Sequence, residues 1–131
     1  MYVGLSEAAQ MKLDCAPSSA RTARRFVADR CAAAQVAEQG CDTALLLTSE
    51  LVTNAITHGR SDVRVSVRSA PGRLRVEVGD DNSRHPVLQP EDDGALDGRG
   101  LQMVDLLATR WGVVDDEIGK VVWFELHYPV S

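Results

Sequence analysis

The chain has 131 residues, of which 44% are hydrophobic and 25% are charged, and its formal net charge at pH 7 is −5. This length predicts a single domain, residues 1–131, that buries a core without disulfides or a structural metal. The negative charge argues against a protein that binds nucleic acid directly through its phosphates. No apolar run approaches the ~18 residues of a membrane span and no signal pattern opens the chain, so we expect a cytoplasmic protein without membrane contact.

The three cysteines, Cys15, Cys31 and Cys41, are odd in number and show no Cys-x-x-Cys spacing. Cysteines in a reducing compartment stay free and behave as small hydrophobic residues. The sequence therefore predicts three free thiols that serve as small core residues.

Alternation of apolar and polar residues over positions 10–15 predicts the first strand. Pro17 and Ser18 are typical of a helix start, and Gly40 is expected to end that helix. Its arginines lie outside a narrow apolar stripe and form either a solvated face or a docking surface for an acidic partner. These arginines are Arg21, Arg24, Arg25 and Arg30.

A second helix is predicted from an N-cap at Asp42 to Gly59, and most of its circumference is apolar, so it should cover a sheet. One side of this helix carries polar residues at helical spacing: Glu50, Asn54, Thr57 and His58. Unpaired polar groups taken out of water cost roughly 1–3 kcal/mol each. A partner is therefore expected to face this side of the helix.

A hairpin follows, because residues 63–68 and 74–78 alternate valine or leucine with polar residues around a turn at 69–72. The same alternation places Asp80 on the core side and Asp81 on the solvent side. A run of two aspartates, an asparagine and a serine is more often a simple turn. An aspartate buried at the end of a strand is the more informative alternative.

Periodicity is lost over residues 84–97, which are acidic and interrupted by proline and glycine, so we expect a long surface loop. Loops of this length inside compact domains are often lids or binding elements. Gly98 and Gly100 then precede a predicted helix from Leu101. Backbone N–H groups at a helix start suit anion binding, although glycines before a helix are common without it.

The chain ends in two predicted strands, the first from Val113 and the second from 121 to 128, around a turn at 115–120. The core side of the last strand is expected to carry Val122, Phe124, Leu126 and Tyr128. Trp123 and Val121 fall on the opposite face, covered either by the amino-terminal segment or by a second subunit. The element order predicts an α+β two-layer sandwich, with a mostly antiparallel sheet and about three helices on one face. Neither a Rossmann nor a P-loop motif is present.

Residues 50–59, ELVTNAITHG, resemble the N box of the histidine-kinase-like (GHKL) ATPases, and most closely that of the anti-sigma-factor serine/threonine protein kinases. Residues 78–80 are similar to the next motif of that family, residues 98–101 to its glycine box, and residues 119–126 to its closing strand. The resemblance extends over roughly residues 10–128. It implies a Bergerat-type ATP-binding fold with a mixed, mostly antiparallel sheet.

The resemblance also implies ATP and Mg²⁺ as cofactors and gives residues their roles. Asn54 would hold the magnesium ion, Glu50 would act as general base on a serine or threonine hydroxyl, and Asp80 would accept the adenine amino group. Residues of the glycine box would contact the phosphates, with the 84–97 loop as lid: Gly98, Arg99, Gly100 and Leu101. His58 would contact phosphate or, as we favour, pack.

Two motifs depart from the family pattern. Asn82 and Arg84 stand where glycines usually follow the aspartate, and Lys120 to Val122 lack the threonine that the family commonly has near it. Glycine there lets the backbone approach the nucleotide closely, so the adenine side of the site is altered.

The implied function is that of an anti-sigma factor with protein kinase activity toward an antagonist protein, whose partners are a sigma factor or the antagonist. The resemblance is compatible with a homodimer. Retention of both Glu50 and Asn54 favours this enzyme. The altered adenine side favours the alternative, a non-catalytic adaptor of the same fold that binds a regulatory partner with weak or no nucleotide binding. A histidine-kinase fragment is a third and more distant interpretation.

Overall fold

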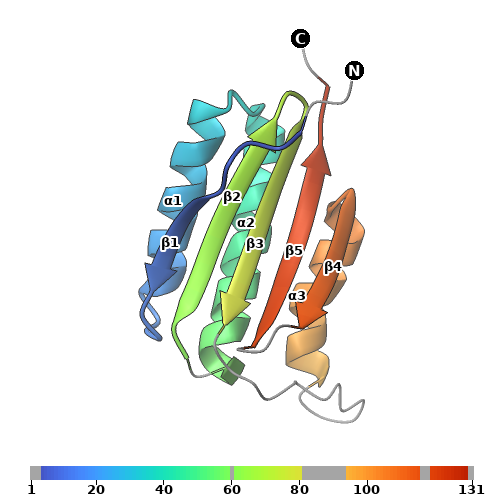
Figure 1. Cartoon of the computed structure of the whole chain (residues 1–131). Coiled ribbons are helices and arrows are strands. Elements are labelled where there is room, and N and C mark those ends of the chain that lie inside the picture. Colours follow the sequence, from blue (N-terminus) through green and yellow to red (C-terminus); the bar gives the residue numbers. More distant parts are fainter. Residues whose placement is uncertain (1–3, 60, 81–93, 116–118, 130–131) are drawn as a thin grey trace.

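The computed structural model describes residues 4–59, 61–80, 94–115 and 119–129, and Figure 1 shows the chain. Its elements, in chain order, are β1 (Ala9–Leu13), α1 (Ser19–Ala33), α2 (Glu38–Asn54), the π-helical turn η1 (Ala55–Gly59), β2 (Val63–Ala70), β3 (Arg73–Asp80), α3 (Gly94–Leu107), β4 (Arg110–Asp115) and β5 (Lys120–His127). No helix in these ranges is long and apolar enough to cross a membrane.

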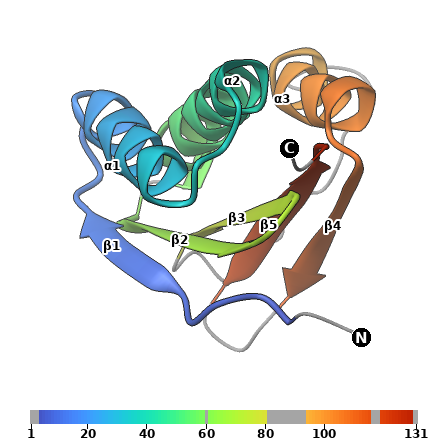
Figure 2. The ribbon, with the colours of Figure 1, turned by 90° about the horizontal axis from the view of Figure 1, so that it is seen from above.

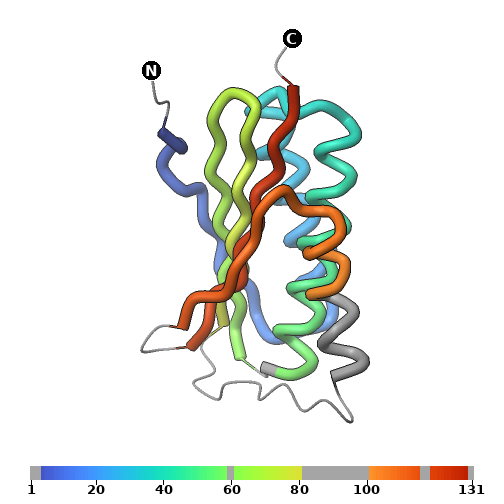
Figure 3. Tube along the Cα trace, turned by 90° about the vertical axis from the view of Figure 1, so that its right-hand side faces the viewer, coloured from blue at the N-terminus to red at the C-terminus, as the bar shows by residue number. Residues whose placement is uncertain are grey.

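The five strands form one sheet in the order β1-β2-β3-β5-β4, and the three α-helices cover one of its faces (Figures 2 and 3). This is the two-layer α+β sandwich predicted from the element order. The family resemblance implied a mixed sheet, whereas each of the four described strand pairings is antiparallel.

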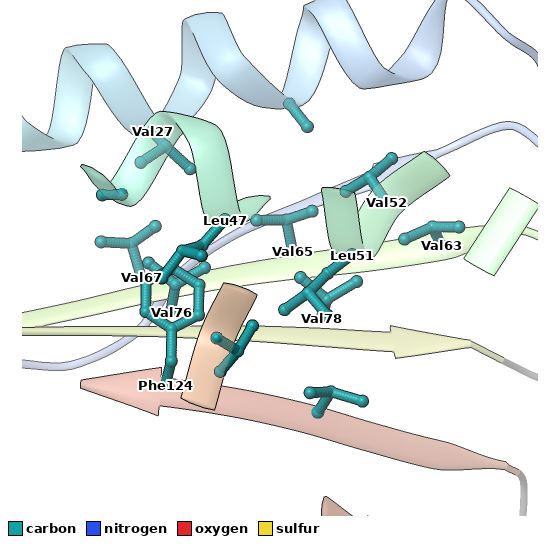
Figure 4. Close-up of a cluster of buried hydrophobic side chains, with 14 of the residues drawn as sticks. Val27, Leu47, Leu51, Val52, Val63, Val65, Val67, Val76, Val78 and Phe124 are labelled. Atoms are coloured by element: carbon teal, nitrogen blue, oxygen red, sulfur yellow. The ribbon is translucent and has the colours of Figure 1, made fainter. Parts of the chain in front are cut away.

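The core lies between α2 and the middle of the sheet (Figure 4). Leu47 and Val52 of α2 are fully buried, as are alternate valines of β2 and β3. Burying a side chain of this size contributes roughly 1.5–3 kcal/mol. As predicted, Val122, Phe124 and Leu126 supply the core side of β5.

The boundary between the first two helices differs from the prediction. α1 ends at Ala33, and Gln35 takes a left-handed conformation with φ of 57°. Hydrogen bonds from Gln35 N to Ala32 O and from Val36 N to Cys31 O complete a Schellman motif. The chain thus turns without the predicted Gly40 or the predicted cap Asp42, which both lie inside α2.

Gly40 has a packing role instead. A Cβ at this position would lie 3.1 Å from Val36 Cγ1, so its absence lets the inter-helix segment pack closely on the first turn of α2. Glycine there serves close packing and not a left-handed turn.

The third helix also begins earlier than predicted. α3 starts at Gly94, so residues 94–97 are helical and do not belong to a loop, and residues 84–93 lie outside the described part. Similarly, β4 begins at Arg110, before the predicted Val113.

The cysteines are free, as predicted, but differ in burial: Cys15 is exposed, Cys31 is buried and Cys41 is intermediate. The prediction that all three are core residues is therefore wrong for Cys15, which follows β1. Burial and the neighbouring Cys41 thiol raise the pKa of Cys31 to about 12, so its thiol stays protonated at neutral pH.

Candidate functional site

Glu50 and Asn54 lie one turn apart at the carboxyl end of α2. Both are partly exposed, whereas Leu51 and Val52 between them are buried in the core. The buried neighbours hold the backbone of Glu50 and Asn54 in place, while the two side chains stay accessible to a ligand.

The polar side of α2 faces away from α1. The Cys41 thiol of α2 is hydrogen-bonded to the Cys31 thiol of α1, which marks the flank of α2 that contacts α1. Glu50 follows Cys41 by nine residues, and nine steps of about 100° place it half a turn away, with Asn54 beside it. Since α2 lies between α1 and α3 and packs against both, Glu50 and Asn54 lie on the flank that faces α3 (Figure 2).

The helix changes form directly after Asn54. Residues Ala55–Gly59 make the π-helical turn η1, in which Thr57 is exposed and His58 is partly buried. The Cys15 thiol donates to Ile56 O at a Sγ–O distance of 3.7 Å and ties this turn to the end of β1. Single π-helical turns are rare and frequently occur at functional sites.

Asp80 is the last residue of β3 and is only 2% exposed, as the alternation predicted. In the sheet register it lies between Val63 of β2 and Lys120 of β5. β3 contacts η1, so this carboxylate lies at the same end of the domain as the polar side of α2 (Figure 1). Asp81, predicted to be exposed, lies outside the described residues.

The glycine box does not stand at a helix start. Gly98 and Gly100 lie within α3, four or more residues after its first residue, Gly94. The free N–H groups of an α-helix belong to its first four residues, and later ones bond within the helix. The expectation that residues 98–100 open the helix is therefore wrong, whereas their contact with phosphate stays a prediction. Leu101 packs against the core.

A magnesium ion would find one oxygen donor on α2, the Asn54 amide. No group of three or more His, Cys, Asp or Glu residues in the described ranges could hold a metal. Such a sparse donor set fits Mg²⁺, which typically takes one or two protein ligands and fills its shell with phosphates and water.

The sequence reading missed a second buried carboxylate, Glu125 of β5, which is 2% exposed on the face without helices. It accepts hydrogen bonds from Arg75 Nη1 at 2.9 Å and Arg73 Nη2 at 3.4 Å, and its Oε1 lies 3.0 Å from His127 Nε2. Alternation along β5 could have placed Glu125 opposite to Phe124. That arginines of the neighbouring strand bury Glu125 could be predicted only from the cross-strand register.

Comparison with known proteins identifies the family of this chain. The family model of the histidine kinase-like ATPase domain matches residues 13–126. An uncharacterized protein of Streptomyces coelicolor (strain ATCC BAA-471 / A3(2) / M145) is 39% identical over 70 residues, which are 50% of this chain and 67% of that protein.

Two solved structures are also similar. The RsbU and RsbW domains of Rv1364c from Mycobacterium tuberculosis match 94% of this chain with a TM-score of 0.71 and 19% identity, and this chain spans 32% of theirs. The histidine kinase domain of the blue-light activated histidine kinase from Erythrobacter litoralis EL346 matches 68% of this chain and 45% of its own, with a TM-score of 0.49 and 28% identity. Because the family model covers nearly the whole chain, this protein belongs to the histidine kinase-like ATPase domain family.

Proposed function

We propose that this domain binds ATP with Mg²⁺ and transfers the terminal phosphoryl group to a serine or threonine of an antagonist protein. One observation carries the proposal: Glu50 and Asn54 share the flank of α2 that faces α3, and the buried Asp80 lies at the same end of the domain. Family membership supports nucleotide binding.

In this mechanism Asn54 would hold the magnesium ion, which would supply positive charge to offset that of the phosphates. Glu50, one turn away, takes the proton of the acceptor hydroxyl. Asp80 would accept a hydrogen bond from the adenine amino group, and its burial would keep water from competing for that hydrogen bond. Phosphoryl transfer depends mainly on positioning and electrostatic stabilisation, for which a rigid helix is suited.

We assign the phosphate side to the amino-terminal part of α3, with Gly98, Arg99, Gly100 and Leu101 as the contacting segment. Since these residues are helical, phosphate binding would require the first turns of α3 to rearrange, or phosphate to approach the helix N-terminus itself. Glycines at positions 98 and 100 lower the cost of such a rearrangement, because glycine is a poor helix former.

We further propose that the domain acts in the cytoplasm as an anti-sigma factor within a partner-switching system. The solved structure with an RsbW domain supports this partner class through its shared fold. The partners would be a sigma factor, an antagonist protein or both, and the proposal includes a homodimer of this chain.

A second candidate is an adaptor of the same fold that holds a regulatory partner and binds nucleotide weakly or not at all. The helical state of residues 98–100 favours it, because their N–H groups bond within α3. Lys120 also favours it, because it lies opposite Asp80 in the strand where the family commonly has a threonine.

Calorimetric titration of the purified chain with ATP and Mg²⁺ separates these functions. The kinase requires saturable binding that depends on Mg²⁺. Heat of dilution alone at millimolar ATP, from protein whose fold is verified by circular dichroism, would exclude the kinase and leave the adaptor.

A further inference from the structure

The face of the sheet opposite the helices is not covered by any described helix (Figure 2). Residues that pair across neighbouring antiparallel strands point to the same face, so the register defines which side chains lie there. Residues 4–8 cross one end of this outer face at the β2–β3 turn, where Ser6 N donates to Ser69 O at 2.8 Å (Figure 1).

The outer face has the opposite charge to the rest of the chain. By register, its charged side chains are Lys12, Arg64, Arg68, Arg73, Arg75 and Arg110, with the carboxylates Glu77 and Glu125. These described strands thus present six cations against two acids, whereas the whole chain has 14 basic and 19 acidic residues. Such an asymmetry creates a local positive potential on an acidic protein.

Two of these cations are paired in the middle of the face, and a third, Lys12 at its edge, lies 3.7 Å from Asp62. Arg75 donates from Nε to Glu77 and from Nη1 to Glu125, both at 2.9 Å, and Arg73 pairs with Glu125 at 3.4 Å. The pairs fix the side chains in the middle of the face and leave little charge there.

Unneutralised charge remains at the two sides of this centre. Arg68 and Arg110 occupy the ends of one register row, which runs through Arg75 and Glu125. Both are exposed, and neither has an ion-pair partner among the described residues. Strands lie about 4.8 Å apart, so three strand spacings separate the two arginines by roughly 14 Å.

An apolar surface lies beside this row. Trp123 of β5 lies under the Arg75 guanidinium, 4.0 Å from the ring centroid. Gly112 of β4 is the cross-strand partner of Trp123. A Cβ at position 112 would come within 2.8 Å of the indole, so glycine lets the ring pack directly against β4. Val114, 51% exposed, and Val121 continue the apolar surface.

We propose that this outer face binds an acidic, partly apolar segment of a partner protein. Carboxylates of the segment would pair with Arg68 and Arg110, and its apolar side chains would pack on Trp123 and Val114. Arginine and tryptophan are the residue types that most often dominate binding energy at protein interfaces. The surface lies on the face away from Glu50 and Asn54, so this inference does not depend on nucleotide binding.

The positive charge of the outer face distinguishes between its candidate binding partners. A second copy packed face to face would bring like-charged arginines together, which costs free energy. Nucleic acid would meet a chain whose net charge is −5. An acidic protein segment meets the positive potential without either penalty.

The test uses a fluorescein-labelled peptide in which glutamate alternates with leucine, measured by fluorescence anisotropy in physiological salt. Replacing both exposed arginines, Arg68→Glu with Arg110→Glu, is expected to weaken binding at least tenfold. The matched control, Arg21→Glu with Arg25→Glu on α1, makes the same change of net charge elsewhere and should alter affinity by less than about twofold. Equal losses in both variants would overturn the proposal, as would no binding by the wild type.

A second measurement on the wild-type chain does not depend on variants. The chain has two tryptophans, and the Trp111 Nε1 donates to Asp105 Oδ1 at 2.9 Å on the helix side. On peptide addition the indole N–H signal of Trp123 should shift in NMR spectra and that of Trp111 should not. A shift of Trp111 alone contradicts the proposed surface. Tighter binding of a single-stranded oligonucleotide than of the peptide would assign the face to nucleic acid and overturn the protein partner.

Discussion

Glu50 and Asn54 stand one helical turn apart on the same flank of α2, and the proposed mechanism gives them separable tasks. A magnesium ligand contributes to nucleotide binding, whereas a general base acts only when the acceptor reacts. Substitutions at the two positions should therefore affect different quantities.

Asn54→Ala is expected to weaken Mg²⁺-dependent ATP binding at least tenfold in calorimetry, because the metal loses its protein ligand. Glu50→Gln should leave ATP affinity nearly unchanged and slow phosphoryl transfer to a cognate antagonist about 10²–10⁴-fold. Unchanged affinity in the first variant would remove Asn54 as the ligand, and unchanged transfer in the second would remove Glu50 as the base.

Lys120 lies directly opposite the buried Asp80, at the edge where the adenine ring is proposed to bind. Lys120→Thr supplies the hydroxyl that the family commonly has in this strand and removes a cation from beside the carboxylate. Tighter ATP binding is the expected result, by calorimetry on both chains. The matched variant Lys120→Ala removes the cation without adding the hydroxyl and should bind more weakly than Lys120→Thr.

Thr48 lies on the core side of α2 and is fully buried, and its hydroxyl has no hydrogen-bond partner in the described part of the chain. Leaving such a group unsatisfied costs about 1–3 kcal/mol. Thr48→Val keeps the shape and removes the hydroxyl, so it should raise the free energy of unfolding by about 1 kcal/mol in urea denaturation. Thr48→Ser keeps the hydroxyl, loses a methyl group and should destabilise. A destabilised Thr48→Val would show that the hydroxyl is satisfied.

Strand alternation was enough to predict the burial of Asp80, because the side chains of a strand take turns between two faces. It could not predict Glu125, which lies on the solvent side by phase and is buried by arginines of the neighbouring strand. Cys15 was also misjudged, since it continues the alternation of β1 but lies beyond the end of that strand. The local alternation of residues predicts which face of the strand a side chain lies on, whereas its burial depends on neighbours that are distant in sequence.

At the scale of elements, the link between α1 and α2 depends on Gln35, an exposed residue with positive φ at the C′ position of a Schellman motif. Glycine is the residue best suited to this position, because the left-handed conformation costs other residues roughly 1 kcal/mol. Gln35→Gly should therefore raise the midpoint of thermal unfolding, as measured by circular dichroism, by a few degrees. Ala34→Gly is the control, since Ala34 has φ of −92° and gains nothing from glycine. Equal effects of the two variants would contradict the role of the backbone conformation.

The same link explains why helix boundaries were predicted less well than helices. The sequence predicts that Gly40 ends the first helix, but Gln35 makes the left-handed turn, and Gly40 lies inside α2, where it leaves room for Val36. Likewise the sequence predicts that Gly98 and Gly100 precede a helix, whereas α3 contains both. Glycine can mark a turn or a close contact, and the sequence alone does not distinguish the two.

At the scale of the whole molecule, the order of strands and helices was sufficient to predict the two-layer sandwich and the face that α2 covers. The motif at residues 50–59 predicted the family to which the chain belongs. The charge distribution over the outer face was not predicted, because it arises when β2, β3, β5 and β4 are placed side by side. Those arginines lie on one face because their strands pair in the sheet, although they are far apart in the sequence.

Glu125 links β3 and β5 from the outer face and makes stability depend on pH. Burial alone would raise the pKa of Glu125, but hydrogen bonds from His127 and Arg75 and the charge of Arg73 outweigh it and lower the pKa from 4.5 to about 2. Because the folded-state pKa is lowered, the stabilisation is fully present above about pH 4.5 and is lost as the pH falls towards 2.

Glu125→Gln should therefore lower the free energy of unfolding at pH 7 by up to roughly 3 kcal/mol, at about 1.4 kcal/mol per pKa unit. The difference between wild type and variant should shrink as the pH approaches 2, where the wild-type carboxylate is increasingly protonated. Urea denaturation of both chains across this range measures the difference directly. Glu77→Gln is the matched control, because Glu77 is more exposed and pairs only with Arg75 among the described residues, so its cost should stay below about 1 kcal/mol. A Glu125→Gln cost that is the same at both ends of the range would show that packing around the side chain, and not its charge, stabilises the outer face.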